Sequence, residues 1–328
     1  MNITILGGGG FLGRKIAARL AEDGTLGGQR IGSLTLFDVA APPKPDAAFP
    51  VASITGDIVE LPEAAIPAGT DVVFHLAAVV SAQAEADYDL GRRVNLRGTD
   101  AVIDRCRALA AAGGKPPRVV FTSSVASFSA SQDMILPDNT RQIPGNSYGA
   151  QKAAAELILA DASRRGFLDA VSLRLPTVIV RPGRPNKAAS SFFSAIVREP
   201  LLGLDTDLPV PDDFAVWVCS PRRAVDWLLH AASMDTGKLG LDRSIDPPGI
   251  STTVAHLLQA LEDAAPGATA RVRRVEDRSI CAIVSTWPPA FEALHARTLG
   301  FSAHEPIRDV IQAFIEDDLE ATRAERAS

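Results

Sequence analysis

The stretch NITILGGGGFLG, residues 2–13, decides the fold. A β-branched run leads directly into Gly7, Gly10 and Gly13, spaced G-x-x-G-x-x-G, and a helical pattern begins beside them. In such a unit the first glycine allows a tight turn, the second lets the backbone approach a pyrophosphate, and the third permits close packing of helix on strand. The order of strand, loop and helix therefore favours a dinucleotide-binding loop over a merely flexible turn. Phe11 and Leu12, inside the loop, are expected beside the cofactor.

The second apolar run, LTLFD, ends in Asp38, which indicates the choice of cofactor. A carboxylate at this point can accept hydrogen bonds from the ribose hydroxyls of NAD, and it would repel the 2′-phosphate of NADP. No arginine follows in VAAPPKP, so we expect NAD. Asp57 and Ile58, after the third run, are candidates for the adenine site, although Asp57 could equally be a helix cap.

Strand and helix patterns alternate through the first half of the chain. Continuous apolar runs predict strands buried on both faces, and helical patterns separate several of them. The expected strands are 2–6, 34–37, 51–55, 71–76, 118–124 and 170–175, and the expected helices are 11–23, 86–112 and 148–165. This alternation predicts an α/β protein with a Rossmann-type, doubly wound parallel sheet.

The texture changes after Arg181, where VRPGRPNKAASS reads as a loop. We expect an NAD-binding domain over 1–180 that carries the catalytic residues. A smaller substrate-binding lobe should follow over 181–328, with some segments returning to the main domain. Its shorter elements are expected near 189–198, 214–219, 221–233 and 251–263, with helices at 288–299 and 305–325.

Charge and cysteine content exclude several classes of partner. The 328-residue chain has a net charge of −6 and no basic cluster, which argues against nucleic acid. No apolar stretch approaches membrane-spanning length. The three cysteines are widely spaced, so we expect neither disulfides nor a bound metal, and a reducing cytoplasm. Small solutes are the expected ligands.

One of only two tyrosines opens the helix in NSYGAQKAAAELI, residues 146–158, with a lysine four residues later. Tyr148 and Lys152 therefore share a helix face. Lowering the pKa of a tyrosine from about 10 to about 7 requires roughly 4 kcal/mol of preference for the phenolate. An ammonium about 4 Å away supplies about that much at an effective dielectric of about 20. We expect Lys152 to make Tyr148 usable as an acid or base, unless the spacing is coincidence.

The fifth strand ends in Ser123 and Ser124, at the edge of the sheet where open α/β folds bind ligands. A serine hydroxyl there can hold a substrate oxygen beside the tyrosine. Paired serines at the end of a strand are otherwise common turn formers.

Taken in order, the glycine loop, Asp38, HLAA at 75–78, VNLRGT around Asn95, Ser124 and Y-x-x-x-K resemble the extended short-chain dehydrogenase/reductases. The resemblance covers nearly the whole chain. It implies a catalytic Ser124, Tyr148 and Lys152, of which the last two also contact the cofactor. It places five further residues near the cofactor: Ala77, Asn95, Ser123, Pro176 and Thr177. Asn95 resembles the family's structural asparagine, and His75 is expected near the cofactor without a catalytic role.

Many family members are nucleotide-sugar epimerases, but SFS (127–129), RLPT (174–177) and SPRR (220–223) depart from their patterns. Longer stretches, such as LRLPTVIVRPGRPN, are instead similar to a branch that oxidises the 2-hydroxyl of a four-carbon sugar acid to a 2-keto acid with NAD. A nucleotide-sugar 4-epimerase and a regulatory dinucleotide-binding protein without turnover are the alternatives. The resemblance also implies a homodimer, formed through helices 86–112 and 148–165.

A sugar-acid substrate requires a cation for its carboxylate, ideally the fork of an arginine. Arg184 and Arg222 are the candidates, and Arg222 is preferred because it replaces an acidic position of the family pattern. Either could instead be a solvated surface residue. Ser81, Ser124, Tyr148, Thr177, Asn186 and Ser191 are expected at the hydroxyls, and Trp217 is expected either as a wall of the pocket or in the core.

Overall fold

A computed structural model describes residues 1–185, 188–302 and 306–327. Seven parallel strands form the central sheet in the order β13-β9-β7-β6-β1-β4-β5. Their bounds are β1 Asn2–Leu6, β4 Ser33–Asp38, β5 Val51–Thr55, β6 Val72–His75, β7 Arg118–Ser124, β9 Asp169–Leu175 and β13 Ser244–Ile245. The six predicted strands and the doubly wound sheet are confirmed.

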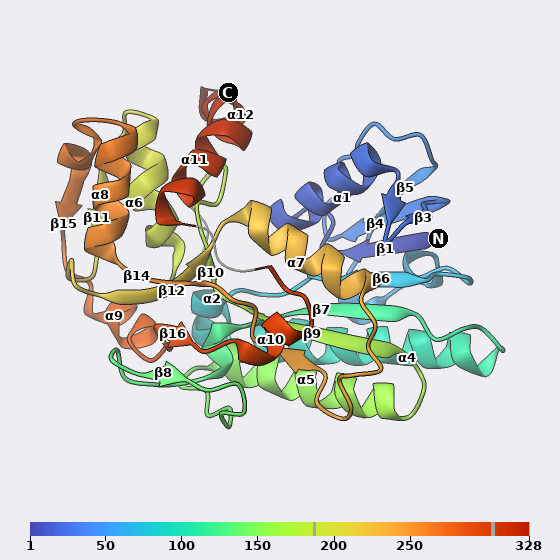
Figure 1. Ribbon diagram of the computed structural model, residues 1–328. Coiled ribbons are helices and arrows are strands. Elements are labelled where there is room, and N and C mark those ends of the chain that lie inside the picture. The colour runs from blue at the N-terminus through green and yellow to red at the C-terminus, as the bar shows by residue number, and fades with distance from the viewer. Residues whose placement is uncertain (186–187, 303–305, 328) are drawn as a thin grey trace.

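Helices cover both faces of this sheet (Figure 1). On one face α1 (Phe11–Asp23) and α7 (Pro221–Ser233) pack on one core cluster, and on the other α4 (Gly98–Ala111) and α5 (Ser147–Arg164) pack on another. Strand residues alternate between the two clusters: Ile5 faces the first and Leu6 the second. Burial on both faces explains why these strands are continuously apolar in sequence.

A second group of elements lies to one side of the sheet, at the left of Figure 1. A mixed sheet, β10-β12-β14, packs with several helices on a third core cluster that contains Phe193 and Trp217. The elements of this lobe are β10 Thr177–Val178, α6 Ser191–Leu201, β11 Thr206–Leu208, β12 Ala215–Cys219, β14 Ile250–Thr253, α8 Val254–Ala264, β15 Val272–Arg274, α9 Arg278–Val284, α11 Ile307–Asp317 and α12 Leu319–Ala327.

Shorter elements complete the chain. Two two-stranded sheets pair β2 with β3 and β8 with β16, and α2 and α3 precede α4 through a π-helical turn at Arg93–Arg97. Their bounds are β2 Thr25–Leu26, β3 Gln29–Arg30, α2 Ser81–Ala86, α3 Tyr88–Arg92, β8 Ile135–Leu136, β16 Ala290–Phe291 and α10 Leu294–Thr298.

Three expectations about elements need correction. The pattern at 288–299 is not one helix: β16 pairs with β8 there, and only α10 is helical. The pattern at 305–325 is two helices, which meet at Asp318. The region 86–112 is divided by the π-helical turn.

Two segments from beyond residue 181 belong structurally to the main domain. Strand β13 pairs with β9, and α7 packs with α1 on the sheet (Figure 1). The expected return of C-terminal segments to the main domain therefore has a structural basis in β13 and α7, whereas the boundary at residue 180 stays a prediction.

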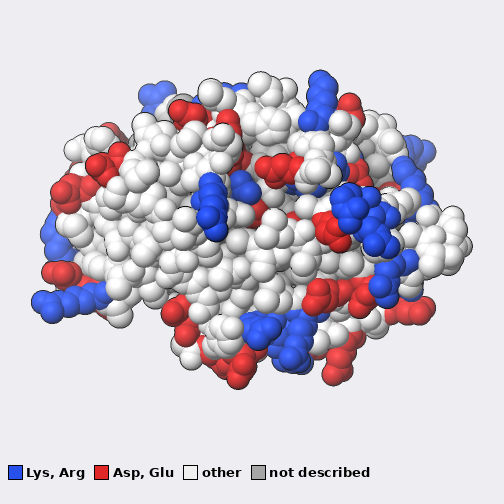
Figure 2. All heavy atoms as spheres, turned by 90° about the horizontal axis from the view of Figure 1, so that it is seen from below, with Lys and Arg blue, Asp and Glu red and all other residues white. Residues whose placement is uncertain are grey.

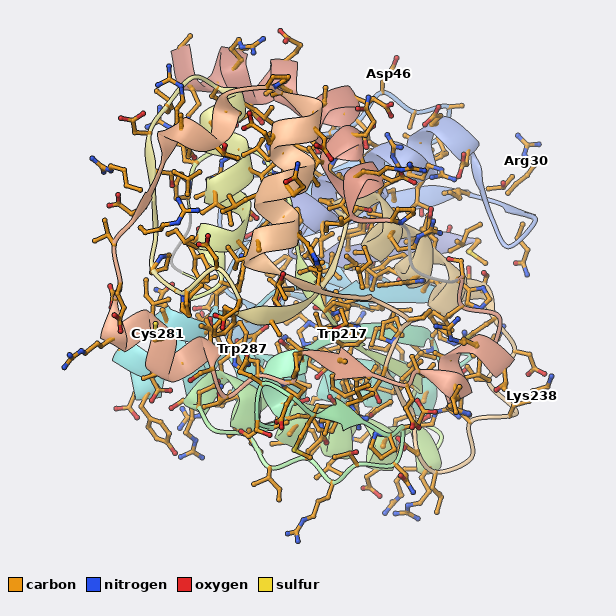
Figure 3. All side chains as sticks on the ribbon, turned by 60° about the vertical axis from the view of Figure 1, so that its left-hand side comes forward. Arg30, Asp46, Trp217, Lys238, Cys281 and Trp287 are labelled. Atoms are coloured by element: carbon orange, nitrogen blue, oxygen red, sulfur yellow. The ribbon has the colours of Figure 1, made fainter. Side chains whose placement is uncertain are left out.

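Surface charge is mixed on the face that α5 helps to form. Figure 2 shows Lys and Arg interspersed with Asp and Glu around a broad uncharged area. Figure 3 shows Arg30, Asp46 and Lys238 extending outward, while Trp217 and Trp287 lie within the molecule. None of the helices in the described ranges combines the length and the apolar character needed to cross a membrane.

Candidate active site

The glycine loop adopts the geometry that its sequence predicts. Gly7 has a φ of +92°, and a Cβ there would lie 2.8 Å from the Ala77 nitrogen. A Cβ on Gly13 would lie 2.2 Å from the Gly7 oxygen, so this glycine permits α1 to approach the loop. Gly10 caps α1, and a Cβ there would meet only the Gly7 oxygen, at 3.3 Å. The second glycine thus borders open space at a helix N-terminus, as binding of a diphosphate requires.

Asp38 ends β4 beside this loop, and the backbone holds both of its carboxylate oxygens. Gly9 N donates to Oδ2 at 2.9 Å, and Val39 N donates to Oδ1 at 2.7 Å. Each carboxylate oxygen retains acceptor capacity for a ribose hydroxyl. The carboxylate is therefore fixed at the wall of a cavity of ≈ 650 Å³, here termed the Asp38 cavity.

Asp57 and Ile58 both line the Asp38 cavity. Asp57 caps a short 3-10 helix through Val59 N at 3.0 Å and also forms an ion pair with Arg93. The hydrogen bond from Val59 and the charge of Arg93 lower the pKa of Asp57. The capping role considered for Asp57 is therefore present, and the residue still faces the cavity.

Three cavities that share lining residues follow one another along the carboxyl edge of the sheet, and together they are here termed the groove. A second cavity, of ≈ 340 Å³, lies at the glycine loop and shares Gly7 and Gly10 with the Asp38 cavity. A third, the Tyr148 cavity of ≈ 180 Å³, shares Phe11 and Leu12 with the second. The groove therefore runs from Asp38 past the helix N-terminus to Tyr148. This path matches an extended dinucleotide, so the residues present fit NAD.

Of the two predicted cofactor residues that follow β6, one lines the Asp38 cavity and the other supports its wall. Ala77 lines the Asp38 cavity. Asn95 does not: its side chain bonds to both backbone groups of Val79 and donates to Gln151 Oε1 at 2.7 Å. Asn95 thus ties the cavity wall to α5 and is a structural residue rather than a direct cofactor ligand.

His75 is buried behind this wall. Its Nε2 lies 3.0 Å from Thr99 Oγ1, and the Thr99 hydroxyl donates to the Asn95 carbonyl oxygen at 2.8 Å. Nε2 therefore carries the proton that it donates to Thr99. Burial lowers the pKa of His75 to about 3, and Lys152 adds to this effect. His75 is neutral and structural.

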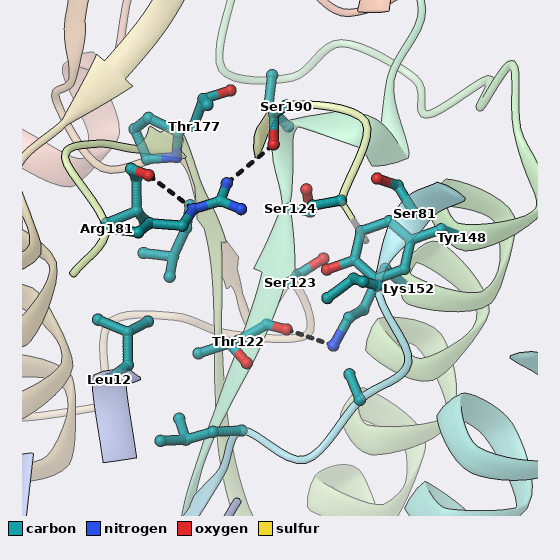
Figure 4. A pocket seen from close by; sticks show the side chains of 18 of the residues that line it. Leu12, Ser81, Thr122, Ser123, Ser124, Tyr148, Lys152, Thr177, Arg181 and Ser190 are labelled. Atoms are coloured by element: carbon teal, nitrogen blue, oxygen red, sulfur yellow. Dashed lines mark hydrogen bonds between the residues drawn. The ribbon is translucent and has the colours of Figure 1, made fainter. Parts of the chain in front are cut away.

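Tyr148 lies in the first turn of α5, where Asn146 caps the helix by accepting from Gly149 N at 2.8 Å. A Cβ on Gly149 would lie 1.8 Å from the Ala126 carbonyl oxygen, so this glycine brings α5 against the segment after β7. That close approach places Tyr148 beside Ser124 in the Tyr148 cavity (Figure 4). The predicted helix face and the predicted end of a strand therefore meet.

Lys152 lies beneath Tyr148, with its Nζ 5.6 Å from the tyrosine ring centroid and donating to the Thr122 carbonyl oxygen at 2.8 Å (Figure 4). Burial lowers the pKa of Lys152 to about 7, and the nearby Glu156 carboxylate opposes that fall. Lys152 is therefore only partly protonated near pH 7.

The expectation that Lys152 lowers the pKa of Tyr148 needs correction. Burial raises that pKa to about 12, and the groups that oppose the rise are Arg181, through its charge, and Ser124, through a hydrogen bond. Sequence spacing identified Lys152, but it could not reveal that a second cation from the other lobe faces the same phenol.

Ser123 and Ser124 both line the cavity, and their hydroxyls have different partners. Ser124 Oγ accepts from Ala126 N at 3.1 Å and bonds with Tyr148. Ser123 Oγ donates to Glu156, which lies inside the protein. Ser124 is therefore the serine placed to hold a substrate oxygen, whereas Ser123 links the strand to a buried charge network.

That network lies behind Lys152. Arg174 donates to Glu156 Oε2 at 2.9 Å and to Asp246 Oδ2 at 3.2 Å, and all three side chains are buried. Burial raises the pKa of Asp246 to about 7, with Arg174 opposing the rise. The network joins α5, β9 and the segment after β13 behind the catalytic residues.

The structure brings some expected substrate ligands to the cavity and separates others. Ser81, Pro176 and Thr177 line the Tyr148 cavity, whereas Arg184 and Ser191 line the cavity at the glycine loop. Asn186 lies outside the described residues. Arg184 therefore faces the region expected for the diphosphate.

The expected roles of Arg222 at the substrate carboxylate and of Trp217 as a pocket wall need correction. Arg222, at the start of α7, is committed to Glu316 and Asp317, at 3.0 and 2.6 Å, on an exposed surface. Trp217 is buried against Phe291, with ring centroids 4.4 Å apart, and does not line the Tyr148 cavity. Trp287 lines it instead. The ion pairs between α7 and α11 and the packing of Trp217 on Phe291 are long-range contacts without a local sequence signal.

Sequence reasoning also missed Arg181 and Ser190, which line the Tyr148 cavity from the lobe side (Figure 4). The available signal was the position of Arg181 in the segment that follows the sixth predicted strand, three residues before Arg184.

Comparisons with known proteins agree with this site. The profile described as the NAD dependent epimerase/dehydratase family matches residues 3–218. The chain belongs to this family. Its membership confirms the predicted NAD cofactor and the resemblance to extended short-chain dehydrogenase/reductases, and the chain is an NAD-dependent oxidoreductase.

Full-length relatives of this epimerase/dehydratase family member carry two kinds of name. D-erythronate dehydrogenases from Cupriavidus necator and Haemophilus influenzae are 46% and 38% identical to this chain; each match covers 97% of the chain, and 98% and 100% of the relatives. A crystal structure described as the nucleoside-diphosphate-sugar epimerase from Agrobacterium tumefaciens has 44% identity and a TM-score of 0.92, over 98% of this chain and 96% of that one.

Proposed function

We propose that the protein oxidises the 2-hydroxyl of a small sugar acid, D-erythronate to 2-keto-D-erythronate, with NAD. The observation that carries the proposal is the meeting of Ser124, Tyr148 and Lys152 with Pro176 and Thr177 in one small cavity at the end of the cofactor groove. Its ≈ 180 Å³ is below the roughly 300–1,000 Å³ of pockets for drug-sized ligands, which favours a short substrate. Two relatives named for this activity support the choice of acid.

In the proposed reaction, the Ser124 hydroxyl holds the substrate oxygen and Tyr148 accepts the proton of the 2-hydroxyl. NAD, when bound, supplies the hydride acceptor for C2 and a positive charge near the phenol. Lys152 is tied to Thr122 and stays beneath the tyrosine ring, where its protonated form adds positive charge near the phenol. The protein's tasks are therefore orientation and movement of one proton at the Tyr148 oxygen.

A nucleotide-sugar 4-epimerase is the second candidate, because the 44% identical Agrobacterium structure carries that description. An epimerase uses the same residues but returns the hydride, so it produces no net NADH. A regulatory protein without turnover is less well supported, because the serine, tyrosine and lysine converge on one cavity.

The test is NADH formation at 340 nm with NAD or NADP and a panel of D- and L-erythronate, D- and L-threonate and UDP-sugars. NAD-dependent reduction with one acid supports the dehydrogenase. Interconversion of UDP-sugars without net NADH, together with no reaction of any acid, would establish the epimerase instead.

We further propose a homodimer formed through α5 and the helices within residues 86–112. Tyr88 and Leu157, on these helices, are 58% and 69% exposed. Light scattering of the wild type and of Leu157→Glu tests the proposal, and a monomeric wild type would overturn it. A cytoplasmic location stays a prediction.

A further inference from the structure

Arg181 stands on the lobe side of the Tyr148 cavity, at the end of the segment that follows β10. Its Nε donates to the Val178 carbonyl oxygen at 2.9 Å, and its Nη2 donates to Ser190 Oγ at 2.8 Å. The backbone of Arg181 is also held, because its N–H donates to Ser194 Oγ and its carbonyl oxygen accepts from Arg198. The guanidinium is therefore pre-positioned rather than a mobile surface charge.

Among the described residues, these bonds leave part of the fork without a partner. A guanidinium has five N–H donors, and two of those of Arg181 are used, both with neutral acceptors. The nearby Arg198 pairs with Glu199, and Arg174 pairs with Glu156 and Asp246, yet within the described part of the chain Arg181 has no carboxylate partner. A partly buried cation without a counter-ion costs folding free energy, so its retention at a cavity wall points to an anionic ligand.

The direction of the side chain adds the second argument. Figure 4 shows the Arg181 guanidinium extending across the cavity toward Ser124 and Tyr148. In a 2-hydroxy acid the carboxylate carbon is bonded to the carbon that bears the reacting hydroxyl. A carboxylate on Arg181 would therefore bring the 2-hydroxyl toward Ser124 and Tyr148, and C2 toward Pro176 and Thr177 on the same wall.

We propose that Arg181 binds the substrate carboxylate and makes the site specific for 2-hydroxy acids, an inference that rests on the proposed dehydrogenase function. The role expected for Arg222 or Arg184 is thereby assigned to Arg181. A bidentate contact between guanidinium and carboxylate selects both the charge and the orientation of the acid.

Arg181 also favours the Tyr148 phenolate, so loss of activity alone would not identify its role. The discriminating experiment compares the active acid with its primary amide, which keeps the 2-hydroxyl and loses the charge. We would measure kcat/KM for both with the wild type, Arg181→Met, Arg181→Lys and Arg222→Ala. Calorimetry would give the Kd of NAD, and of the acid for the complex with NADH.

We expect Arg181→Met to lower kcat/KM for the acid by roughly 100-fold or more and to change that for the amide much less. The Kd of the acid should rise by a similar factor, and the Kd of NAD should stay within about two-fold. Arg181→Lys should recover part of the loss, because it keeps the charge without the fork. Arg222→Ala, on the exposed surface, is the control expected to match the wild type.

Equal losses for acid and amide would show that Arg181 acts through Tyr148 or the loop, and would overturn the inference. If the methionine variant fails to fold, the wild type still decides: an amide that reacts as well as the acid would refute a carboxylate site. If the wild type oxidises an acid and the Arg181 variants have the same kcat/KM for it, only this inference is refuted. A wild type inactive on every acid would refute the proposed function and this inference with it.

Discussion

Lys152 Nζ donates a hydrogen bond of 2.8 Å to the carbonyl oxygen of Thr122, near the end of β7. This bond joins the helix that carries Tyr148 to the strand that carries Ser124, and it uses the ammonium as a structural link as well as a charge. The position of Lys152 beneath the phenol is therefore set by the sheet itself.

Replacing Tyr148 with Phe removes the proposed base and preserves the ring that packs in the cavity. We expect kcat to fall by roughly 10²–10⁴-fold, as for loss of a general acid or base. The Kd of NAD from calorimetry should change little, because most of the groove lies elsewhere. Turnover within a few-fold of the wild type would remove Tyr148 from the mechanism.

Glu156→Gln tests the charge network behind the lysine. Glu156 raises the pKa of Lys152, so its neutralisation should lower that pKa further below about 7. If the protonated lysine is the active form, activity in the variant should begin to fall at a lower pH than in the wild type. The variant should also unfold more readily, by about 3 kcal/mol, because the buried Arg174 loses a charged partner. Coincident pH profiles would contradict this role of Glu156.

Asp38→Ala tests cofactor choice. Loss of the carboxylate removes two ribose acceptors and the repulsion of a 2′-phosphate, so the ratio of kcat/KM for NADP to that for NAD should rise by about ten-fold or more. Asp46→Ala, an outward-facing residue of the following loop, is the matched control (Figure 3). An unchanged ratio in the Asp38 variant would show that another group sets the preference.

Because His75 is buried and neutral, we expect the free energy of unfolding to fall as the pH is lowered. Its pKa is about 3 in the folded chain and about 6.5 when unfolded, so the unfolded state binds more protons between these values. The contribution of His75 is complete above pH 6.5 and is lost as the pH falls toward 3. Between pH 6.5 and 4.5 this amounts to about 2 kcal/mol.

Thermal melts of His75→Gln at pH 7 and pH 4.5 would measure this contribution, with the exposed His256→Gln as control. The His75 variant should lose less Tm on acidification than the wild type. The same Tm loss in the wild type and both variants would show that other groups control acid unfolding.

The sequence determined most of what lies on the sheet. Buried strands and the glycine loop carry local signals, so the order from Gly7 to Lys152 could be predicted, including the meeting of Ser124 with Tyr148. The second lobe has weaker sequence signals, because its residues contact partners that are far away along the chain. Arg222 pairs with Asp317, and Trp217 packs on Phe291, only in the folded protein. Arg181 was missed for the same reason, since its approach to Tyr148 depends on how the lobe is placed on the sheet.

The most direct test follows the hydrogen on C2. D-erythronate carrying deuterium at C2 would be incubated with NAD, and the reduced cofactor would be examined by mass spectrometry and NMR while the rate is compared with that of the unlabelled acid. We expect one deuterium per turnover on the nicotinamide ring and 2-keto-D-erythronate as the product. Reduced cofactor without deuterium, or no reduced cofactor at all, would contradict hydride transfer from C2 to NAD.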